Sequence, residues 1–455
     1  MTPISFYTSR SARENVLDAL KKAKMNESYH AFLSINEEQA LARADEIDNN
    51  KSKGKLSGVP FVIKDNFLTP VGATTAASHM LEGFYAPVTA TAVARLEAEG
   101  AICIGRANLD AFAHGGSTEN SAFGPTNNAH DKTRVAGGSS GGSAVVVALD
   151  IVPFALGTDT GGSIRQPASF NGVVGVKPTY GMVSRYGVVA MASSTDVIGV
   201  LANSVDTATI VLDIMGGQDE NDATTLPSYF EPLIGDAPKR RVGVVKEFMS
   251  EDVDPDVRSI TENYIEQLKR NGHTVEEVSL PLAKYALAVY YIVVPAEVSS
   301  NLGRYDGIRY GSRADAQTLA KTYGLSRDKG FETENKRRIM IGSYVLSSGY
   351  FDAYYLQAQK VRTLLINDFN ALFESYDVLV GPVAPTPAFK LGENTADPIK
   401  MYLADIMTVP ASLAGLPALS VPAGTTSAGL PVGVQLIGPR RSDATLLALA
   451  REAEQ

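Results

Sequence analysis

Short apolar runs of strand type alternate with helix-forming segments along most of this chain, and this alternation limits the folds it can adopt. Apolar runs occupy residues 58–63, 101–105 and 151–157, and helical patterns cover 88–99 and 144–149. Strands that alternate with helices pack as a sheet with helices on both faces. The sequence therefore predicts an α/β protein with a central mixed, largely parallel sheet.

The same alternation returns in the second half of the chain. Runs at 241–245 and 274–280 flank a helix expected from about 254 to 270, and a run at 432–437 precedes a helix that begins near Asp443. These segments extend the predicted sheet rather than start a different class of fold.

Two regions depart from the alternation. Residues 1–55 are charged and helical, with apolar positions at helical spacing, and residues 283–375 are mostly helical and rich in tyrosine. We expect an N-terminal helical region over 1–55 and one main domain over 56–455. In this division, 283–375 is a helical insertion within the main domain, and its helices are expected to form part of a partner surface.

Composition excludes several classes of protein. The 455 residues include 41 basic and 50 acidic side chains, a net charge of −9, and a single cysteine, Cys103. An acidic chain of mixed charge is a poor nucleic-acid binder by itself, and one cysteine supports neither a disulfide framework nor a Cys-rich zinc site. Without a signal-peptide pattern or an apolar run of about 20 residues, the sequence predicts a soluble, cytoplasmic protein.

The segment 137–168 holds two Gly-Gly-Ser clusters separated by a helix and a strand. Glycine-rich turns bring backbone N–H groups close to a ligand, and the second cluster, Thr160-Gly161-Gly162-Ser163, would set a serine hydroxyl among several such donors. An acyl-transfer oxyanion needs this arrangement. The pattern favours a nucleophilic serine over a flexible linker because a buried strand precedes the cluster.

A nucleophilic serine needs a base, and none of the five histidines has the sequence context of one. Lys64 directly follows the apolar run at 58–63. Desolvation there would lower the pKa of its amine and let the neutral form accept a proton.

The spacing of these residues resembles the amidase signature family. Members carry a lysine 75 positions before a first serine and a nucleophilic serine 24 positions after it, and here these are Lys64, Ser139 and Ser163. The resemblance implies that Lys64 takes a proton from Ser139, which relays it from Ser163, and that the Gly138–Ser139 peptide bond is cis.

The resemblance also implies roles around this triad. Backbone N–H groups of the turn would form the oxyanion hole, and three further polar side chains would support the site. The oxyanion residues are Thr160, Gly161 and Gly162, with Ser163, and the supporting side chains are Ser140, Asp159 and Arg165. No metal and no cofactor is expected in this chain.

Long matches outside the signature, among them 107–128, 177–199 and 336–355, closely resemble one branch of the family, the glutaminase subunits of tRNA-dependent aspartyl/glutamyl amidotransferases. The resemblance implies that the chain hydrolyses glutamine and passes ammonia to a B subunit, with a small C subunit completing a heterotrimer. The B subunit would use ATP and Mg²⁺ and would make most contacts with Glu-tRNA or Asp-tRNA.

Free glutamine carries an α-carboxylate and an α-ammonium group, so its pocket needs one cation and one anion. The resemblance implies that Arg338 and Asp405 supply them. One of Tyr290 and Tyr291 would line the pocket, and Ser117 and Thr118 are weaker candidates. His114-Gly115 stands where the family more often has Met-Gly, which could alter the pocket wall, and the N-terminal region is shorter than usual in the family.

Other functions fit the same residues less well. The stretch 137–141 formally fits the G-x-S-x-G elbow of α/β-hydrolases, but polar residues precede it where a buried strand is required. Cys103 lies within an apolar run, which favours a structural thiol over a nucleophile. No GKS or GKT follows the glycines, so a phosphate loop is not favoured. A stand-alone amidase acting on another small or aryl amide stays open as the alternative.

Overall fold

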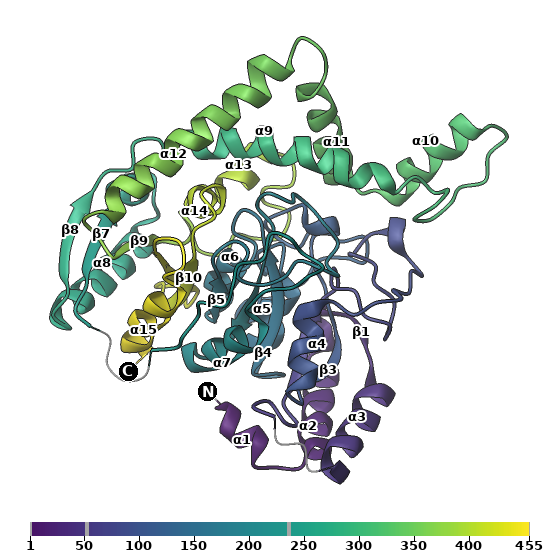
Figure 1. Cartoon of the computed structure of the whole chain (residues 1–455), viewed down its shortest axis with the longest axis horizontal. Helices are drawn as coiled ribbons and strands as arrows, with labels where there is room; N and C mark the ends of the chain where they lie inside the picture. Colours follow the sequence, from purple (N-terminus) through teal and green to yellow (C-terminus); the bar gives the residue numbers. More distant parts are fainter. Residues whose placement is uncertain (1, 51–53, 234–237, 455) are drawn as a thin grey trace.

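The computed structural model describes residues 2–50, 54–233 and 238–454, and within these residues the chain forms one eleven-stranded sheet with helices packed on it (Figure 1). The strand order is β1-β3-β2-β4-β6-β5-β10-β11-β9-β7-β8. The strands are β1 (Phe32–Ile35), β2 (Pro60–Lys64), β3 (Ile102–Ala107), β4 (Phe154–Asp159), β5 (Val174–Lys177), β6 (Val197–Ala202), β7 (Arg241–Val245), β8 (Thr274–Val278), β9 (Val378–Pro382), β10 (Ala418–Thr425) and β11 (Pro431–Ile437).

The α/β class and the mixed sheet are confirmed, but the expectation of a largely parallel sheet is wrong. The pairs β2–β3, β2–β4, β7–β8 and β7–β9 are parallel, and the other six neighbouring pairs are antiparallel. Parallel neighbours need a crossover, usually through a helix. The connections from β5 to β6 and from β10 to β11 contain no α-helix, so these strands return antiparallel.

The helices follow the predicted pattern closely near the strands. They are α1 (Ile4–Thr8), α2 (Ala12–Met25), α3 (Glu37–Asn50), α4 (Thr91–Ala98), α5 (Gly141–Ala148), α6 (Arg165–Asn171), α7 (Val205–Met215), α8 (Pro255–Arg270), α9 (Ala283–Asn301), α10 (Leu319–Gly330), α11 (Thr333–Val345), α12 (Gln357–Phe373), α13 (Pro398–Leu403), α14 (Val409–Leu413) and α15 (Asp443–Glu454). Asp254 caps α8 by accepting from the Asp256 and Val257 backbone N–H groups.

Strand alternation divides the core into two layers. Phe61 and Ile63 of β2 point into one hydrophobic cluster, which includes side chains of α4, α7 and α15, while Val62 points into another with side chains of α2, α3 and α5. Burial on both faces explains why every residue of β2 and β4 is buried. Helices therefore cover both faces of the sheet, as the sequence predicts.

The helical stretch 283–375 stands at one side of the sheet. Figure 1 shows α9, α11 and α12 lying together above the strands, with α10 projecting beyond them. A buried cluster that includes Tyr290 and Val294 of α9 and Phe369 of α12 joins them to the sheet. The segment holds α9, α10, α11 and α12, while its status as an insertion and as part of a partner surface stays a prediction.

The N-terminal helices share the core of the main body. Val16 of α2 and Ala44 of α3 pack in the same cluster as Ile104 of β3, and β1 pairs antiparallel with β3 at the sheet edge. β1 is not among the strands predicted from the sequence. The division expected at residue 55 stays a prediction, and residues 51–53 beside it lie outside the described part.

No helix within the described ranges combines the length and the apolar character that a membrane span requires.

Candidate active site

The site forms where two parallel strands end. β2 and β4 pair in parallel with Ile63 opposite Leu156, so Lys64 at the end of β2 and Thr158 near the end of β4 reach the same edge of the sheet. Side chains at the carboxyl ends of parallel strands are the usual sites of ligand binding in α/β proteins.

Lys64 is fully buried and surrounded by hydroxyl groups. Its Nζ lies 2.7 Å from Ser139 Oγ, 2.9 Å from Ser140 Oγ and 2.9 Å from Thr158 Oγ1. Burial lowers the pKa of this amine to about 7, against the opposing effect of three buried aspartates, Asp110, Asp159 and Asp196. A large fraction of Lys64 is therefore neutral near pH 7 and able to accept a proton.

The first Gly-Gly-Ser cluster holds Ser139 against this amine. The Gly138–Ser139 peptide bond is cis, as expected. Ser140 N donates to the Ser163 carbonyl oxygen at 3.1 Å, and Ser140 Oγ donates to the Thr158 carbonyl oxygen at 3.2 Å. Ser140 thus ties the two serine clusters together, which is the supporting position that the resemblance implies.

The second cluster forms a turn between β4 and α6 in which both glycines are sterically required. A Cβ on Gly161 would lie 2.8 Å from the Tyr290 ring, and one on Gly162, whose φ is +148°, would lie 2.2 Å from Thr408 Oγ1. Within the described chain, the backbone N–H groups of this turn donate to no protein acceptor. These are the N–H groups of Thr160, Gly161, Gly162 and Ser163.

Ser163 lies at the end of this row of free donors and is 8 % exposed. Its hydroxyl makes no hydrogen bond within the described chain. The structure thus brings Lys64, Ser139 and Ser163 to one place and leaves the Ser163 hydroxyl free to attack a substrate. The relay from Ser163 to Ser139 stays a prediction.

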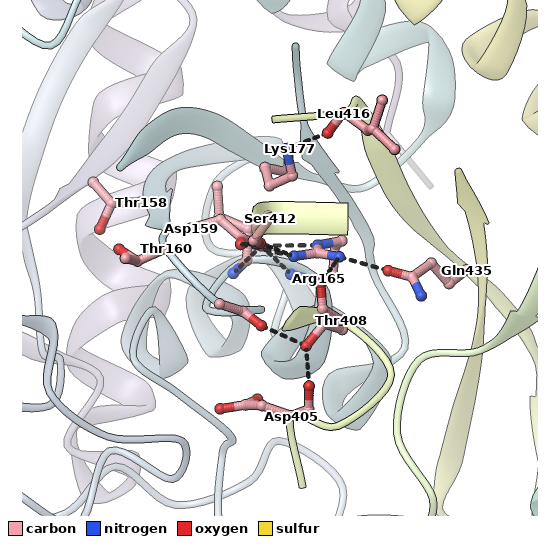
Figure 2. Close-up of polar contacts among 12 residues, drawn as sticks. Thr158, Asp159, Thr160, Arg165, Lys177, Asp405, Thr408, Ser412, Leu416 and Gln435 are labelled. Carbon is pink, nitrogen blue, oxygen red and sulfur yellow. Dashed lines mark hydrogen bonds and ion pairs between the residues drawn. The ribbon is translucent and has the colours of Figure 1, made fainter. Parts of the chain in front are cut away.

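Asp159 and Arg165 form an ion pair next to the turn, and both are fully buried (Figure 2). Arg165 pairs with Asp159 at 2.9 Å and also donates to the Thr408 carbonyl oxygen and to Gln435 Oε1. Burial raises the pKa of Asp159, but the Arg165 charge and hydrogen bonds outweigh it and leave the pKa below its usual value. The pair anchors the ends of the turn, and its supporting role in catalysis stays a prediction.

A cavity of about 260 Å³ reaches the turn through Asp405, and none of residues 160–163 is among the residues that line it. Arg338 from α11 and Asp405, which follows α13, line it together with Tyr291 and Tyr402. Asp405 also lies next to the nucleophile turn, since a Cβ on Gly162 would be 3.1 Å from its Oδ1. Two residues far apart in the sequence thus bring one guanidinium cation and one carboxyl group to a single cavity.

The cation and the anion have different surroundings. Arg338 donates to Glu334 Oε1 at 2.8 Å and lies over the rings of Tyr291 and Tyr402. Asp405 Oδ1 is buried without a hydrogen-bond partner among the described residues. Burial, with the nearby Asp159 charge, raises the pKa of Asp405 to about 8. This carboxyl group is positioned to receive a cationic ligand group, which would restore its ionised form.

The structure separates the two tyrosine candidates. Tyr291 lines the cavity and stacks on Tyr402 with ring centroids 3.8 Å apart, whereas Tyr290 is buried against Gly161 and supports the turn. Ser117 and Thr118 are fully buried and are not among the residues that line this cavity. Thr118 Oγ1 donates to the Gly137 carbonyl oxygen at 2.7 Å and so supports the first glycine cluster instead.

His114 lies behind the cavity rather than on its wall. Its Nδ1 accepts a hydrogen bond from the Asn335 side-chain amide, and its Nε2 is buried without a partner among the described residues. Burial, with the Arg338 charge, lowers the pKa of His114 well below its usual value, so the ring is neutral. Its predicted effect on the pocket stays a prediction.

Several residues of the site were not predicted from the sequence. Thr158 holds Lys64, Asp110 accepts the backbone N–H groups of Ser117, Thr118 and Asn120, and Glu334 and Tyr402 complete the surroundings of Arg338. Thr158 could have been found, because it directly follows the predicted strand 151–157, which leads to Ser163. The others approach the site only through tertiary folding.

Among the described residues, no group of three His, Cys, Asp or Glu side chains is arranged to hold a metal ion.

Known proteins resemble this chain over nearly its whole length. A family model described as Amidase matches residues 14–447. The A subunit of glutamyl-tRNA(Gln) amidotransferase from Cyanothece sp. (strain PCC 7425 / ATCC 29141) is 52 % identical over 439 residues, which cover 94 % of this chain and 91 % of that protein. The protein of the same name from Lactiplantibacillus plantarum is 51 % identical over 93 % of this chain and 88 % of its own length.

Solved structures give the same picture. The crystal structure of the glutamyl-tRNA(Gln) amidotransferase A subunit from Thermotoga maritima is 41 % identical, with a TM-score of 0.84, and the match covers 99 % of this chain and 94 % of that one. A bacterial aryl acylamidase at 23 % identity and a TM-score of 0.87, matched over 99 % of this chain and 94 % of its own, shares the fold.

Proposed function

This chain belongs to the amidase signature family, and from that premise we propose that it is the glutaminase subunit of a tRNA-dependent amidotransferase. The observation that carries the proposal is the cavity in which Arg338 and Asp405 lie together beside the Ser163 turn. A free α-amino acid amide presents a carboxylate to the arginine and an ammonium group to the aspartate.

In the proposed reaction, neutral Lys64 accepts the Ser139 hydroxyl proton while Ser139 accepts the proton of Ser163. Ser163 Oγ then attacks the side-chain carbonyl of glutamine. The free N–H groups of residues 160–163 stabilise the negative charge that develops on the carbonyl oxygen. The proton returns through Ser139 to the amide nitrogen as the C–N bond breaks, which releases ammonia and leaves an acyl ester on Ser163.

A water molecule then resolves the ester. Lys64 and Ser139 would activate this water as they activated Ser163, and the second tetrahedral intermediate would use the same N–H groups. The products are glutamate and the free enzyme. The low pKa of Lys64, set by burial, supports its return to the neutral form after each cycle.

The released ammonia would serve partner subunits. We infer that B and C subunits complete a heterotrimer in which the B subunit binds ATP and Mg²⁺ and amidates Glu-tRNA(Gln), Asp-tRNA(Asn) or both. Relatives that are named as one subunit of glutamyl-tRNA(Gln) amidotransferase support this assembly. The net charge of −9 fits a chain that leaves most tRNA contacts to its partner. The enzyme would act in the cytoplasm.

The test is ammonia release from glutamine by the purified chain, alone and then with B and C subunits, tRNA and ATP. We expect turnover that Ser163→Ala abolishes. Failure to hydrolyse glutamine under every condition, with Ser163-dependent cleavage of other small or aryl amides, would instead support a stand-alone amidase and reject the substrate assignment.

A further inference from the structure

We propose that Asp196 is a positioning residue that sets the oxyanion turn and ties it to the helical segment 283–375. This inference rests on one part of the proposed function, namely that the N–H groups of the turn stabilise an oxyanion. Asp196 is buried, and its two carboxylate oxygens have separate tasks. Oδ1 accepts from Thr160 Oγ1 at 2.7 Å, while Oδ2 accepts from the backbone N–H groups of Met191 at 2.8 Å and Ala192 at 3.0 Å.

Thr160 is the first residue of the oxyanion turn, and its side chain is buried. β4 and β6 pair antiparallel with Asp159 opposite Val197, so Thr160 and Asp196 are the next residues beyond the paired ends of these strands. The carboxylate therefore fixes the turn where it leaves the sheet. The direction of the following N–H groups depends on this point, because Gly161 and Gly162 add no side-chain anchors of their own.

The loop 191–196 is held at its other side by the helical segment. Arg362 of α12 donates to Ser194 Oγ at 3.0 Å, and Glu297 of α9 accepts from Ser194 N at 2.9 Å. Asn301, at the end of α9, donates to the Met191 carbonyl oxygen at 3.1 Å. Asp196 thus closes a continuous series of hydrogen bonds from α9 and α12 to the oxyanion turn.

The turn receives a second support from the same helix, since Tyr290 of α9 lies against Gly161. A shift of α9 relative to the sheet would therefore reach the turn both through the Tyr290 ring and through Asp196. This arrangement offers a physical route by which a partner bound to 283–375 could change the rate of glutamine hydrolysis.

Two variants separate the hydrogen bonds of Asp196 from its charge. Asp196→Ala removes all three acceptor contacts. Asp196→Asn can keep them, because its carbonyl oxygen can accept from Met191 and Ala192 while its amide donates to Thr160 Oγ1, a hydroxyl that can accept as well as donate. The N–H groups stabilise the transition state, so misplacing them lowers kcat and leaves the KM for glutamine nearly unchanged.

The experiment measures kcat, KM and thermal unfolding for both variants in the complete enzyme. A second readout is the rate at which a fluorophosphonate labels Ser163, because the phosphoryl oxygen would use the same N–H groups. We expect Asp196→Ala to lower kcat and the labelling rate by about 10- to 100-fold, and Asp196→Asn to restore most of both. Adding Thr160→Val to Asp196→Ala is expected to cost little more, since both remove the same contact.

An Asp196→Ala enzyme that unfolds at lower temperature but keeps its kcat and labelling rate would overturn the proposal, as would equal loss in the Asn and Ala variants. The labelling readout needs no knowledge of the natural substrate. If the unmodified enzyme fails to hydrolyse glutamine but is labelled at Ser163, the substrate assignment fails while the role of Asp196 is still tested.

Discussion

Lys64 and Lys177 are both fully buried, and burial lowers the pKa of each to about 7, yet only one is placed for catalysis. Lys64 contacts the hydroxyls of Ser139 and Ser140. Lys177 instead donates to the Pro178 carbonyl oxygen and to the Leu416 carbonyl oxygen, and Figure 2 shows the contact with Leu416. Lys64→Met should lower kcat by about 10²- to 10⁴-fold, because the general base is lost. Activity of the unmodified enzyme should rise as pH increases through about 7, since only the neutral amine accepts a proton.

Lys177→Met is the matched control. It leaves buried carbonyl oxygens without a donor and should lower the free energy of unfolding by about 1–3 kcal/mol, while kcat stays within about threefold. Glutaminase assays and thermal unfolding of both variants check this. An equal loss of kcat in the two variants would show that burial of a lysine, rather than its contact with Ser139, governs the rate.

Asp405 should make the binding of glutamine depend on pH. Because burial raises its pKa to about 8 in the unliganded protein, binding the glutamine ammonium group must displace a proton below that pH. The Kd for glutamine should therefore fall by about tenfold per pH unit from pH 6 to 7.5 and level off above about 8. Calorimetric titration of Ser163→Ala enzyme would measure this. Asp405→Asn should bind more weakly, with a Kd that lacks this dependence.

At the scale of elements, the turn between β4 and α6 depends on its contact with α9. A Cβ added at Gly161 would lie 2.8 Å from the Tyr290 ring, so Gly161→Ala must displace either the turn or the helix. We expect kcat to fall by about 100-fold or more, as when an oxyanion donor is lost. Gly324→Ala in α10, where a Cβ meets nothing within 4 Å, should keep full activity. Full activity of Gly161→Ala in steady-state assays would contradict the assigned role of the turn.

At the scale of the whole molecule, the N-terminal helices complete the core that supports the site. Val16 is fully buried against residues of the sheet, while its neighbour Leu17 is 45 % exposed. Val16→Asp should lower the free energy of unfolding by about 3 kcal/mol or more and reduce the yield of active enzyme, because it buries an unpaired charge. Leu17→Asp should change little. Thermal unfolding that is unaffected by Val16→Asp would indicate that residues 1–55 fold apart from the main body.

The sequence alone determined the class of fold, and it predicts the nucleophile. The bounds of β7 were predicted to the residue, because a short apolar run between turn residues depends mainly on local preferences. Lys64, Ser139 and Ser163 were predicted because their spacing and glycine-rich context are properties of the chain itself. The alternation of apolar and helical segments likewise needs no knowledge of distant contacts.

Tertiary structure decided what depends on residues far apart in sequence. Which tyrosine lines the cavity follows from how α9 packs on the turn, and the partners of Arg338 and Thr160 come from other elements. The direction of several strands depended on β5, β6 and β10, which were not among the strands predicted from the apolar pattern. Periodicity reports which face of an element is buried, but not which neighbour covers it, and the hydrogen bonds that shape this site form only between such neighbours.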